Sequence, residues 1–390
     1  MPQKFFCALD LEILKMYTLN DNYFQGEFHI MLKFKDGKFR IMQIADVQED
    51  WPVNPDTIRL IDAALEKIKP DLVVFTGDQI QGYSACYKTD TYNKVKNAIN
   101  AYITPIAKRG IPFTLTFGNH DDDCVTSKAA QLDIYACFEG CTMGEAHSKD
   151  DPATHFLNIK DSKGEKDIFA LYLIDSNKKE PDGAYSPVRI DQLHWLEEAR
   201  EKNGYIPALA FQHIPVPEFY DILKKVPFYT KGALEAYKSR KNTFWVLPGK
   251  EGFFGETPAV PEINNGEFDL LKKHGDILGL FVGHDHNNSF VRKLEGIDLG
   301  YTQGCGFNTY GPADKRGVRI FELDENDLRN YRTYTVTAGE LGVYEPTKKL
   351  QEFIYRNAPT CVDEVITNVK RVAAVTLAVT AVVKFIKLFK

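Results

Sequence analysis

The sequence predicts an α/β fold, an α+β sandwich in which two mixed β-sheets pack together and helices flank them. Two patterns predict this class. From about residue 39, short β-branched runs alternate with amphipathic helical stretches, which indicates a largely parallel sheet. Between residues 290 and 334, several strand-like runs follow one another across short turns, which indicates an antiparallel portion. The two patterns together favour two packed sheets.

The expected elements alternate along the chain. Strands are predicted within residues 39–46, 71–78, 111–122, 167–176, 206–215 and 277–283. Helices are predicted at residues 54–69, 92–108 and 190–201. The first helix has the clearest N-terminal signal, because Asn54 is a favoured N-cap residue and Pro55 stands at the first helical position. We expect an N-terminal extension over residues 1–35, one main domain over 36–340 and a C-terminal extension over 341–390.

Composition restricts the class of protein. The net charge of -6 gives no support to a general nucleic-acid-binding protein, which would usually present a basic face. The 7 cysteines form no paired framework and no zinc-ribbon pattern, and the N-terminus lacks the apolar stretch of a secretory leader. We therefore expect a cytoplasmic protein in a reducing compartment.

The C-terminal segment differs from the rest of the chain. An uncharged run from Val372 to Val383 lies between basic residues on both sides. Two interpretations stay open for residues 366–390: a terminal helix packed on the body, or a cationic helix that makes peripheral contact with a membrane surface.

Polar side chains with metal-ligand character follow five of the predicted strands. Each alone is ordinary, since an Asp or Asn after a strand is commonly a turn residue or a helix cap. In open α/β folds, however, the carboxyl ends of the strands meet at one crevice, so these side chains are expected to lie together. They are Asp46, Asp78, Asn119 with His120 and Asp121, His213, and His284 with His286.

This set of donors favours a pair of divalent cations. It offers carboxylate, amide and imidazole groups without a thiolate, a mixture that suits Mn, Fe or Zn. Several such groups desolvated side by side without a cation would be costly. The sequence therefore predicts a metal site at the strand ends.

The ordered motifs resemble those of the calcineurin-like metallophosphoesterases, over about residues 39–321. The matching residues are Asp46-Val47-Gln48, Gly77-Asp78, Gly118-Asn119-His120-Asp121, His213 and Gly283-His284-Asp285-His286. They look most like the phosphatase branch related to the purple acid phosphatases. The resemblance implies a sandwich of the metallophosphoesterase type, two divalent metal ions and hydrolysis of phosphomonoesters by a metal-activated hydroxide. A phosphodiesterase of the same fold is the alternative.

The resemblance also implies a role for each residue. Asp78 would bridge the two metals, Asp46 and His286 would hold the first, and Asn119, His213 and His284 would hold the second. His120 would stay off the metals, face the substrate and protonate the leaving group. Asp121 would orient His120 or cap the adjoining helix.

The first motif departs from the family pattern, because Gln48 stands where the family commonly has a histidine. Purple acid phosphatases also lack that histidine and compensate with a tyrosine three residues after the bridging aspartate, but this chain has Gln81 there and Tyr83 two places further on. Gln48 either coordinates through its amide oxygen or holds a water in the vacant position. We expect the first metal to bind more weakly than the second. A one-metal enzyme or a metal-binding module with reduced catalysis remains a further interpretation.

The substrate is the least defined feature. A small-molecule phosphoester or a phosphoprotein is expected, and a polynucleotide is disfavoured by the acidic balance. The long insertion at residues 226–268 is either a loop that contacts the substrate or a solvated excursion with its own apolar anchor.

Overall fold

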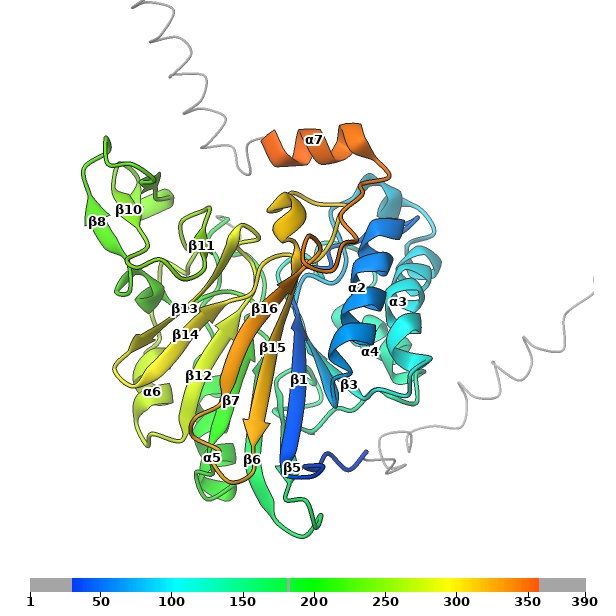
Figure 1. Cartoon of the computed structure of the whole chain (residues 1–390), viewed down its shortest axis with the longest axis vertical. Helices are drawn as coiled ribbons and strands as arrows, with labels where there is room; N and C mark the ends of the chain where they lie inside the picture. Colours follow the sequence, from blue (N-terminus) through cyan, green and yellow to red (C-terminus); the bar gives the residue numbers. More distant parts are fainter. Residues whose placement is uncertain (1–29, 181–182, 358–390) are drawn as a thin grey trace, which may run out of the picture. The chain divides into compact units, whose positions relative to one another are not determined.

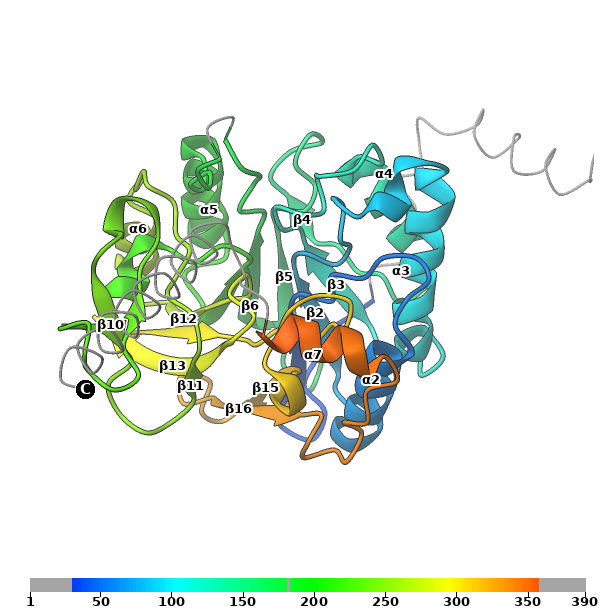
Figure 2. The same cartoon turned by 90° about the horizontal axis from the view of Figure 1, so that it is seen from above.

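The computed structural model describes residues 30–180 and 183–357, and its centre is a pair of packed β-sheets with helices on both outer faces (Figures 1 and 2). A five-stranded sheet has the order β16-β15-β1-β2-β3, and an eight-stranded sheet has the order β11-β13-β14-β12-β7-β6-β5-β4. The predicted α/β sandwich of two mixed sheets is confirmed.

The five-stranded sheet combines a parallel half with an antiparallel half. Its strands are β1 (Lys38–Ile44), β2 (Leu72–Thr76), β3 (Phe113–Thr116), β15 (Gly317–Asp324) and β16 (Arg332–Thr337). β1, β2 and β3 run parallel, whereas β15 pairs antiparallel with both β1 and β16. The parallel half therefore brings the ends of β1, β2 and β3 to one edge.

The eight-stranded sheet contains a parallel centre with antiparallel margins. Its strands are β4 (Glu145–Ala146), β5 (His155–Lys160), β6 (Asp167–Ile174), β7 (Ala208–Gln212), β11 (Phe253–Phe254), β12 (Ile277–Val282), β13 (Asn288–Leu294) and β14 (Ile297–Tyr301). β6, β7, β12 and β14 are parallel neighbours. Strands β4 and β5 were not anticipated from the sequence.

Three helices cover the outer face of the five-stranded sheet and two cover that of the eight-stranded sheet (Figure 2). The first group is α2 (Pro55–Ile68), α3 (Thr91–Ala107) and α4 (Lys128–Ala136), and the second is α5 (Ile190–Lys202) and α6 (Glu267–Lys272). Asn54 caps α2 as predicted, and its Oδ1 accepts a hydrogen bond of 3.0 Å from the backbone of Asp56. This capping satisfies an otherwise unpaired N–H group.

Aromatic side chains fill the space between the two sheets. The Phe321 ring of β15 lies 4.5 Å from the Phe281 ring of β12 and 5.4 Å from the Phe211 ring of β7. All three residues are buried. This contact fixes the two sheets against each other, so that the loops after their strands are held at a common edge.

The remaining elements lie in the insertion, in the connecting segments and near the C-terminus. A small sheet of the insertion has the order β8-β10-β9, with β8 (Lys224–Val226), β9 (Leu234–Glu235) and β10 (Phe244–Val246). Four 3-10 turns are described, η2 (Ala85–Lys88), η3 (Pro217–Tyr220), η4 (Lys238–Arg240) and η5 (Ala313–Lys315). The last helix is α7 (Lys349–Asn357). Within residues 30–180 and 183–357, no helix has both the length and the apolarity to cross a bilayer. Residues 366–390, for which a terminal helix was predicted, lie outside the described part of the chain.

Candidate metal centre

The loops that follow β1, β2 and β12 turn sharply as they leave their strands. Asp46, Asp78 and His284 have φ angles of 51°, 51° and 75°, in the left-handed region that residues with a β-carbon seldom adopt. Gln48 shares this conformation, with a φ of 39°. Such strained residues persist where the surrounding structure holds them, and they concentrate at functional sites.

Two glycines allow these loops to approach one another. A β-carbon on Gly77, whose φ is +89°, would lie 2.7 Å from the Cβ of His213. A β-carbon on Gly118 would overlap the side chain of Asp78. Glycine at both positions therefore lets the ends of β2, β3 and β7 meet.

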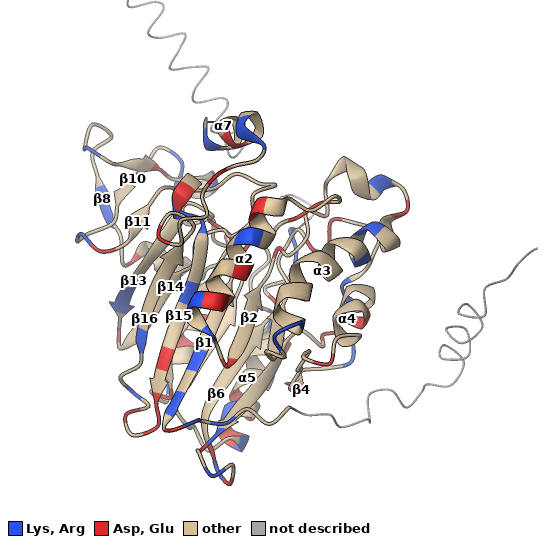
Figure 3. Cartoon of the chain, turned by 45° about the vertical axis from the view of Figure 1, so that its right-hand side comes forward, with Lys and Arg blue, Asp and Glu red and all other residues tan. Residues whose placement is uncertain are grey.

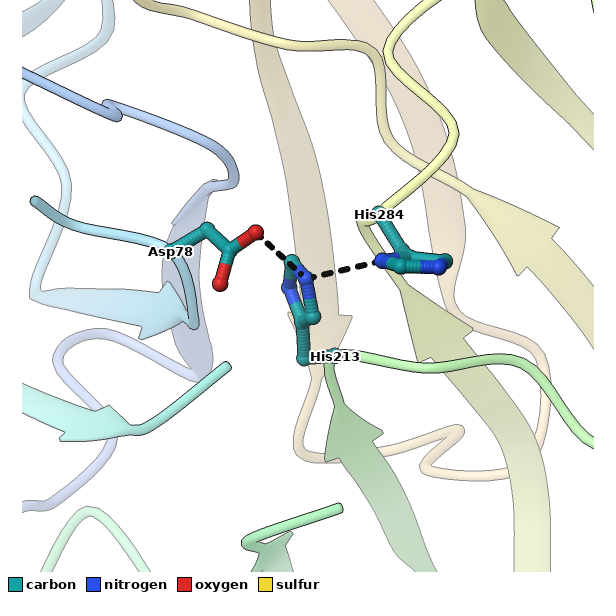
Figure 4. Close-up of side chains that lie close together, drawn as sticks. All are labelled: Asp78, His213 and His284. Carbon is teal, nitrogen blue, oxygen red and sulfur yellow. Dashed lines mark hydrogen bonds and ion pairs between the residues drawn. The ribbon is translucent and has the colours of Figure 1, made fainter. Parts of the chain in front are cut away.

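Asp78, His213 and His284 form the tightest group of metal-ligand atoms among the described residues (Figure 4). Their ligand atoms lie within 4.8 Å of one another, and all three side chains are buried. His213 Nε2 is 3.0 Å from Asp78 Oδ2 and 3.1 Å from His284 Nδ1. His213 Nδ1 lies 3.0 Å from the carbonyl of Thr76, and this contact leaves Nε2 directed at the group.

Asp46 and His286 adjoin this group and make a second pair of donors. His286 Nε2 lies 3.3 Å from Asp46 Oδ1, which is itself 3.9 Å from His213 Nδ1. The Nδ1 of His286 lies 2.8 Å from the carbonyl of Tyr310, and the two rings stack with centroids 4.1 Å apart. A backbone carbonyl thus selects the tautomer whose Nε2 can coordinate.

Several buried polar atoms at this edge have no hydrogen-bond partner among the described residues. They are Asn119 Oδ1, Asn119 Nδ2, Gln48 Oε1 and His284 Nε2. Buried polar atoms are nearly always paired, so a group of unpaired ones at one place indicates a missing ligand. The carboxylate, amide and imidazole donors that carry them suit a divalent cation. The residues present therefore fit the metal ions that the sequence predicted.

The protonation of the three central residues shows why a cation fits there. Burial raises the pKa of Asp78, but the neighbouring imidazoles of His213 and His120 outweigh this effect, so its pKa lies below the usual range. Burial lowers the pKa of His213, yet Asp78 and Asp46 raise it to about 9. Burial and the charge of His213 hold the pKa of His284 well below its ordinary value. Without a metal, one proton on His213 thus partly balances the carboxylates.

We expect metal affinity at this centre to rise with pH. His213 must lose its Nε2 proton to coordinate, and its pKa of about 9 means that below pH 9 the metal has to displace that proton. One displaced proton makes the apparent dissociation constant increase about tenfold for each pH unit below 9. Calorimetric metal titration between pH 6 and pH 9 measures this slope, and a flat profile would contradict a ligand role for His213.

His120 lies beside the central group without joining it. Its backbone N–H donates to Asp78 Oδ1 at 2.7 Å, and its ring Nδ1 lies 2.5 Å from Asp123 Oδ2. Tyr83 packs edge-on against the ring, with centroids 4.6 Å apart. His120 lines the cavity described below, as expected for a residue that faces the substrate.

Asp121 has neither of the two roles expected for it. Its carboxylate accepts backbone hydrogen bonds of 2.8–3.1 Å from Asp78, Gln79, Ile80 and Gly118, so it ties the loop after β2 to the loop after β3. Asp123 contacts the His120 ring, and the adjoining helix α4 is capped by Ser127. Burial and the charge of Asp78 raise the pKa of Asp121 to about 7, although these hydrogen bonds oppose the shift.

The residue three places after Asp78 does not point to the metal centre. Gln81 donates from Nε2 to the carbonyl of Asn308 at 3.1 Å. Tyr83 instead lines the cavity together with Gln48 and Asp78. Sequence reasoning also missed Asp123, Glu256 and Tyr310; Asp123 lies two residues after the motif that ends at Asp121, and Glu256 lies in the 226–268 insertion.

A cavity of about 850 Å³ opens over the centre. Metal-ligand candidates Gln48, Asp78, His284 and His286 line it together with His120. Further lining residues come from the segment before α5, from η3 and from the insertion, and they include Lys179, Tyr185, Tyr220, Tyr237, Lys238, Arg240 and Glu256. The insertion thus forms part of the site wall, which supports the substrate-contact interpretation of it.

Two mixed sheets with metal-ligand side chains gathered after their strands define the metallophosphoesterase type of sandwich. The chain belongs to the calcineurin-like phosphoesterase family, whose sequence model matches residues 39–288. This match confirms the family resemblance drawn from the motifs.

The relatives include proteins named as phosphatases and proteins named as inactive. The "Probable inactive purple acid phosphatase 29" of Arabidopsis thaliana is 28% identical over 75% of this chain and 79% of its own length. The "Phosphatase DCR2" of Saccharomyces cerevisiae is 25% identical over 75% of this chain and 52% of its own length. A solved structure, a dimetal phosphatase from Danio rerio, is 14% identical with a TM-score of 0.47, over 77% of this chain and 99% of that one.

Proposed function

We propose that this protein is a metal-dependent phosphatase that hydrolyses phosphomonoesters with two divalent metal ions. The observation that carries the proposal is the set of buried donor atoms without partners, at Asn119, Gln48 and His284, around the Asp78–His213–His284 group. Of this set, Gln48, Asp78 and His284 line a cavity that is large enough for a small phosphoester or a phosphorylated side chain.

The proposed ligand sets follow the family pattern, and the contacts among Asp78, His213 and His284 and between Asp46 and His286 are compatible with them. Asp78 would serve both metals; Asp46, His286 and Gln48 would hold the first; and Asn119, His213 and His284 would hold the second. When bound, two such cations neutralise charge on the phosphoryl oxygens and lower the pKa of water, which supplies the nucleophile at neutral pH.

The chain's own residues position the substrate and move the proton. His120 stands at the cavity wall beside Asp78, where its imidazole can give a proton to the leaving oxygen. Asp123 fixes the orientation of that ring through Nδ1, and Tyr83 packs against it. Glu256 accepts from the Tyr310 hydroxyl at 3.0 Å, which holds the ring that stacks on His286.

Metal analysis of the purified full-length protein combined with a phosphate-release screen tests this proposal. We expect bound Mn, Fe or Zn and release of phosphate from an aryl phosphate. Faster turnover of a bis-aryl phosphate would instead assign a phosphodiesterase. No release with any of several metals, despite stoichiometric binding, would overturn the catalytic proposal.

A metal-dependent binding module is the second candidate, and Gln48 is the residue that favours it. A neutral amide is a weaker ligand than the imidazole common at this position, so the first metal is expected to be held less firmly. The relative named as an inactive purple acid phosphatase is compatible with this candidate.

Gln48→His is expected to strengthen the first metal site. An imidazole in place of the unpartnered Gln48 Oε1 should lower the dissociation constant of the weaker site on the order of tenfold and leave the other site unchanged. Metal titration by calorimetry reads both sites in one experiment. Two sites of equal affinity in the natural protein, both unaffected by the change, would show that Gln48 is not a determinant of metal binding.

A further inference from the structure

Helix α7 is amphipathic in the reverse sense, because its polar side faces the body and its apolar side faces outward. Leu350 and Ile354 are 73% and 50% exposed, and their spacing places them on one side of the helix. We call these two residues the apolar face of α7. Glu352, on the opposite side, is only 7% exposed. A surface helix of a globular protein ordinarily shows the reverse arrangement.

Polar contacts hold α7 in this orientation. Glu352 lies 3.5 Å from the guanidinium of buried Arg316 and accepts a hydrogen bond of 3.1 Å from the Tyr344 hydroxyl. Gln351 donates to Asn308 Oδ1 at 3.2 Å. The buried ion pair is costly to break because each partner would be left desolvated, so the apolar face is held outward.

A second exposed apolar point lies in the insertion, in the turn that follows β8. Phe228 and Tyr229 are 72% and 77% exposed, and their rings are 5.4 Å apart. We call this pair the aromatic tip. The basic residues Lys224, Lys225 and Lys231 surround it in sequence, and all three are exposed. Large exposed aromatic side chains flanked by lysines are typical of segments that lie in a lipid interface.

Helix α7 and the small sheet that carries the aromatic tip lie at the same edge of the sandwich, the edge toward which β1 runs (Figures 1 and 2). The metal centre lies at this edge too, since Asp46 follows β1. Basic residues mark both β8 and α7 (Figure 3). Two separate apolar points with adjacent positive charge thus stand at the edge that also holds the metal centre.

The sequence that continues from α7 has the same character. After Glu364 no acidic residue follows, while Lys370, Arg371, Lys384, Lys387 and Lys390 alternate with apolar residues. Against a chain whose net charge is -6, this segment is a local concentration of positive charge. Such a composition is attracted to the negative surface of anionic lipids.

We propose that this edge of the protein docks on a bilayer surface rich in anionic phospholipid. The apolar face of α7 and the aromatic tip enter the headgroup region, and the neighbouring lysines contact the lipid phosphates. Two anchoring points at this edge hold the edge with the metal centre toward the lipid surface. A protein partner would need acidic and apolar patches at positions that match the apolar face and the aromatic tip. An anionic bilayer offers negative charge and an apolar interior everywhere along its surface, so the distance between the two points does not matter. The proposal does not depend on the catalytic function.

Cosedimentation of the full-length protein with lipid vesicles tests this proposal. We expect binding to vesicles of phosphatidylcholine mixed with phosphatidylserine, weaker binding to phosphatidylcholine alone, and loss of binding as salt is raised. The double variant Phe228→Glu/Leu350→Glu should bind the mixed vesicles at least about tenfold less tightly. The matched control is Ile190→Glu, at an apolar residue of α5 that is 52% exposed, and it should bind as the natural protein does.

Four results would overturn the proposal. The first is equal binding to both kinds of vesicle, and the second is no binding at all. The third is binding that the double variant retains but that Lys384→Glu/Lys387→Glu abolishes, which would assign the contact to the C-terminal segment alone. The fourth is a dimer in vesicle-free solution that dissociates when the double variant is made, which would assign the face to a second copy of the chain.

Unchanged hydrolysis of a soluble aryl phosphate by the double variant would show that its metal centre is intact. Vesicle binding without any hydrolysis would contradict only the proposed phosphatase function.

Discussion

Asp78→Asn is expected to remove bound metal and to lower phosphate release by at least about a thousandfold. Asp78 Oδ2 lies 3.0 Å from His213 Nε2, and Oδ1 accepts the His120 backbone N–H at 2.7 Å, so this carboxylate contacts both a proposed ligand of the second metal and the loop after β3. Asparagine preserves the shape and one acceptor oxygen but removes the charge. Neither cation would then have a shared anionic ligand to balance its charge in this buried site.

Plasma emission spectrometry of the purified variant and a phosphate-release assay provide the two readouts. The matched control is Asp167→Asn at the start of β6, where the carboxylate makes a 2.9 Å surface ion pair with Lys160. That change is expected to leave metal content and phosphate release unchanged, because an exposed ion pair contributes little to the stability of the fold. Full metal content in Asp78→Asn would contradict a bridging role for Asp78. Thermal unfolding of both variants would show whether a loss of metal results from a loss of fold.

The strand ends could be predicted from the sequence because the relevant physics is local. A buried β-branched run such as Leu72–Thr76 identifies a strand without knowledge of its neighbours, and a polar residue directly after it marks the exit from the core. Parallel topology then gathers those exits at one edge, which is why Asp46, Asp78, His213 and His284 lie together.

The roles of neighbouring acids in one loop could not be predicted in the same way. Asp121, Asp122 and Asp123 are adjacent in sequence, yet Asp121 accepts backbone hydrogen bonds from two loops while Asp123 contacts His120. The path of the loop after β3 decides which of the three acids accepts the backbone hydrogen bonds and which contacts His120, and no sequence pattern specifies that path. Only the structure distinguishes them, because it shows that Asp121 is wholly buried.

The orientation of α7 and the fold of the insertion depend on long-range contacts. The pairing of Glu352 with Arg316 joins residues 36 positions apart, and it turns the apolar face outward against the usual rule for surface helices. Helix α7 was not among the helices predicted from the sequence, and hydrophobic periodicity in any case assumes that a surface helix buries its apolar side. Strands of two or three residues, as in the insertion, are too short to show a periodic pattern.

His120→Ala is expected to lower phosphate release by about a hundredfold to ten-thousandfold while leaving the metal content unchanged. The side chain of His120 contacts Asp123 and Tyr83, whereas only its backbone N–H contacts Asp78, so alanine preserves the bond to the proposed bridging carboxylate. The residue can therefore be removed without removing a metal ligand. The His120→Ala variant thus differs from Asp78→Asn, in which metal content and phosphate release should fall together.

The size of the loss should depend on the leaving group. An alkyl phosphate leaves as a strongly basic alkoxide that requires a proton, whereas a nitrophenyl phosphate leaves as a stable anion that does not. If His120 donates that proton, His120→Ala should reduce kcat far more for the alkyl ester than for the nitrophenyl ester. Asp123→Asn should follow the same order with a smaller loss, because it alters only the orientation and basicity of the ring. Equal losses for both esters would assign His120 to phosphate binding, since a group that binds the phosphoryl oxygens acts on both substrates alike.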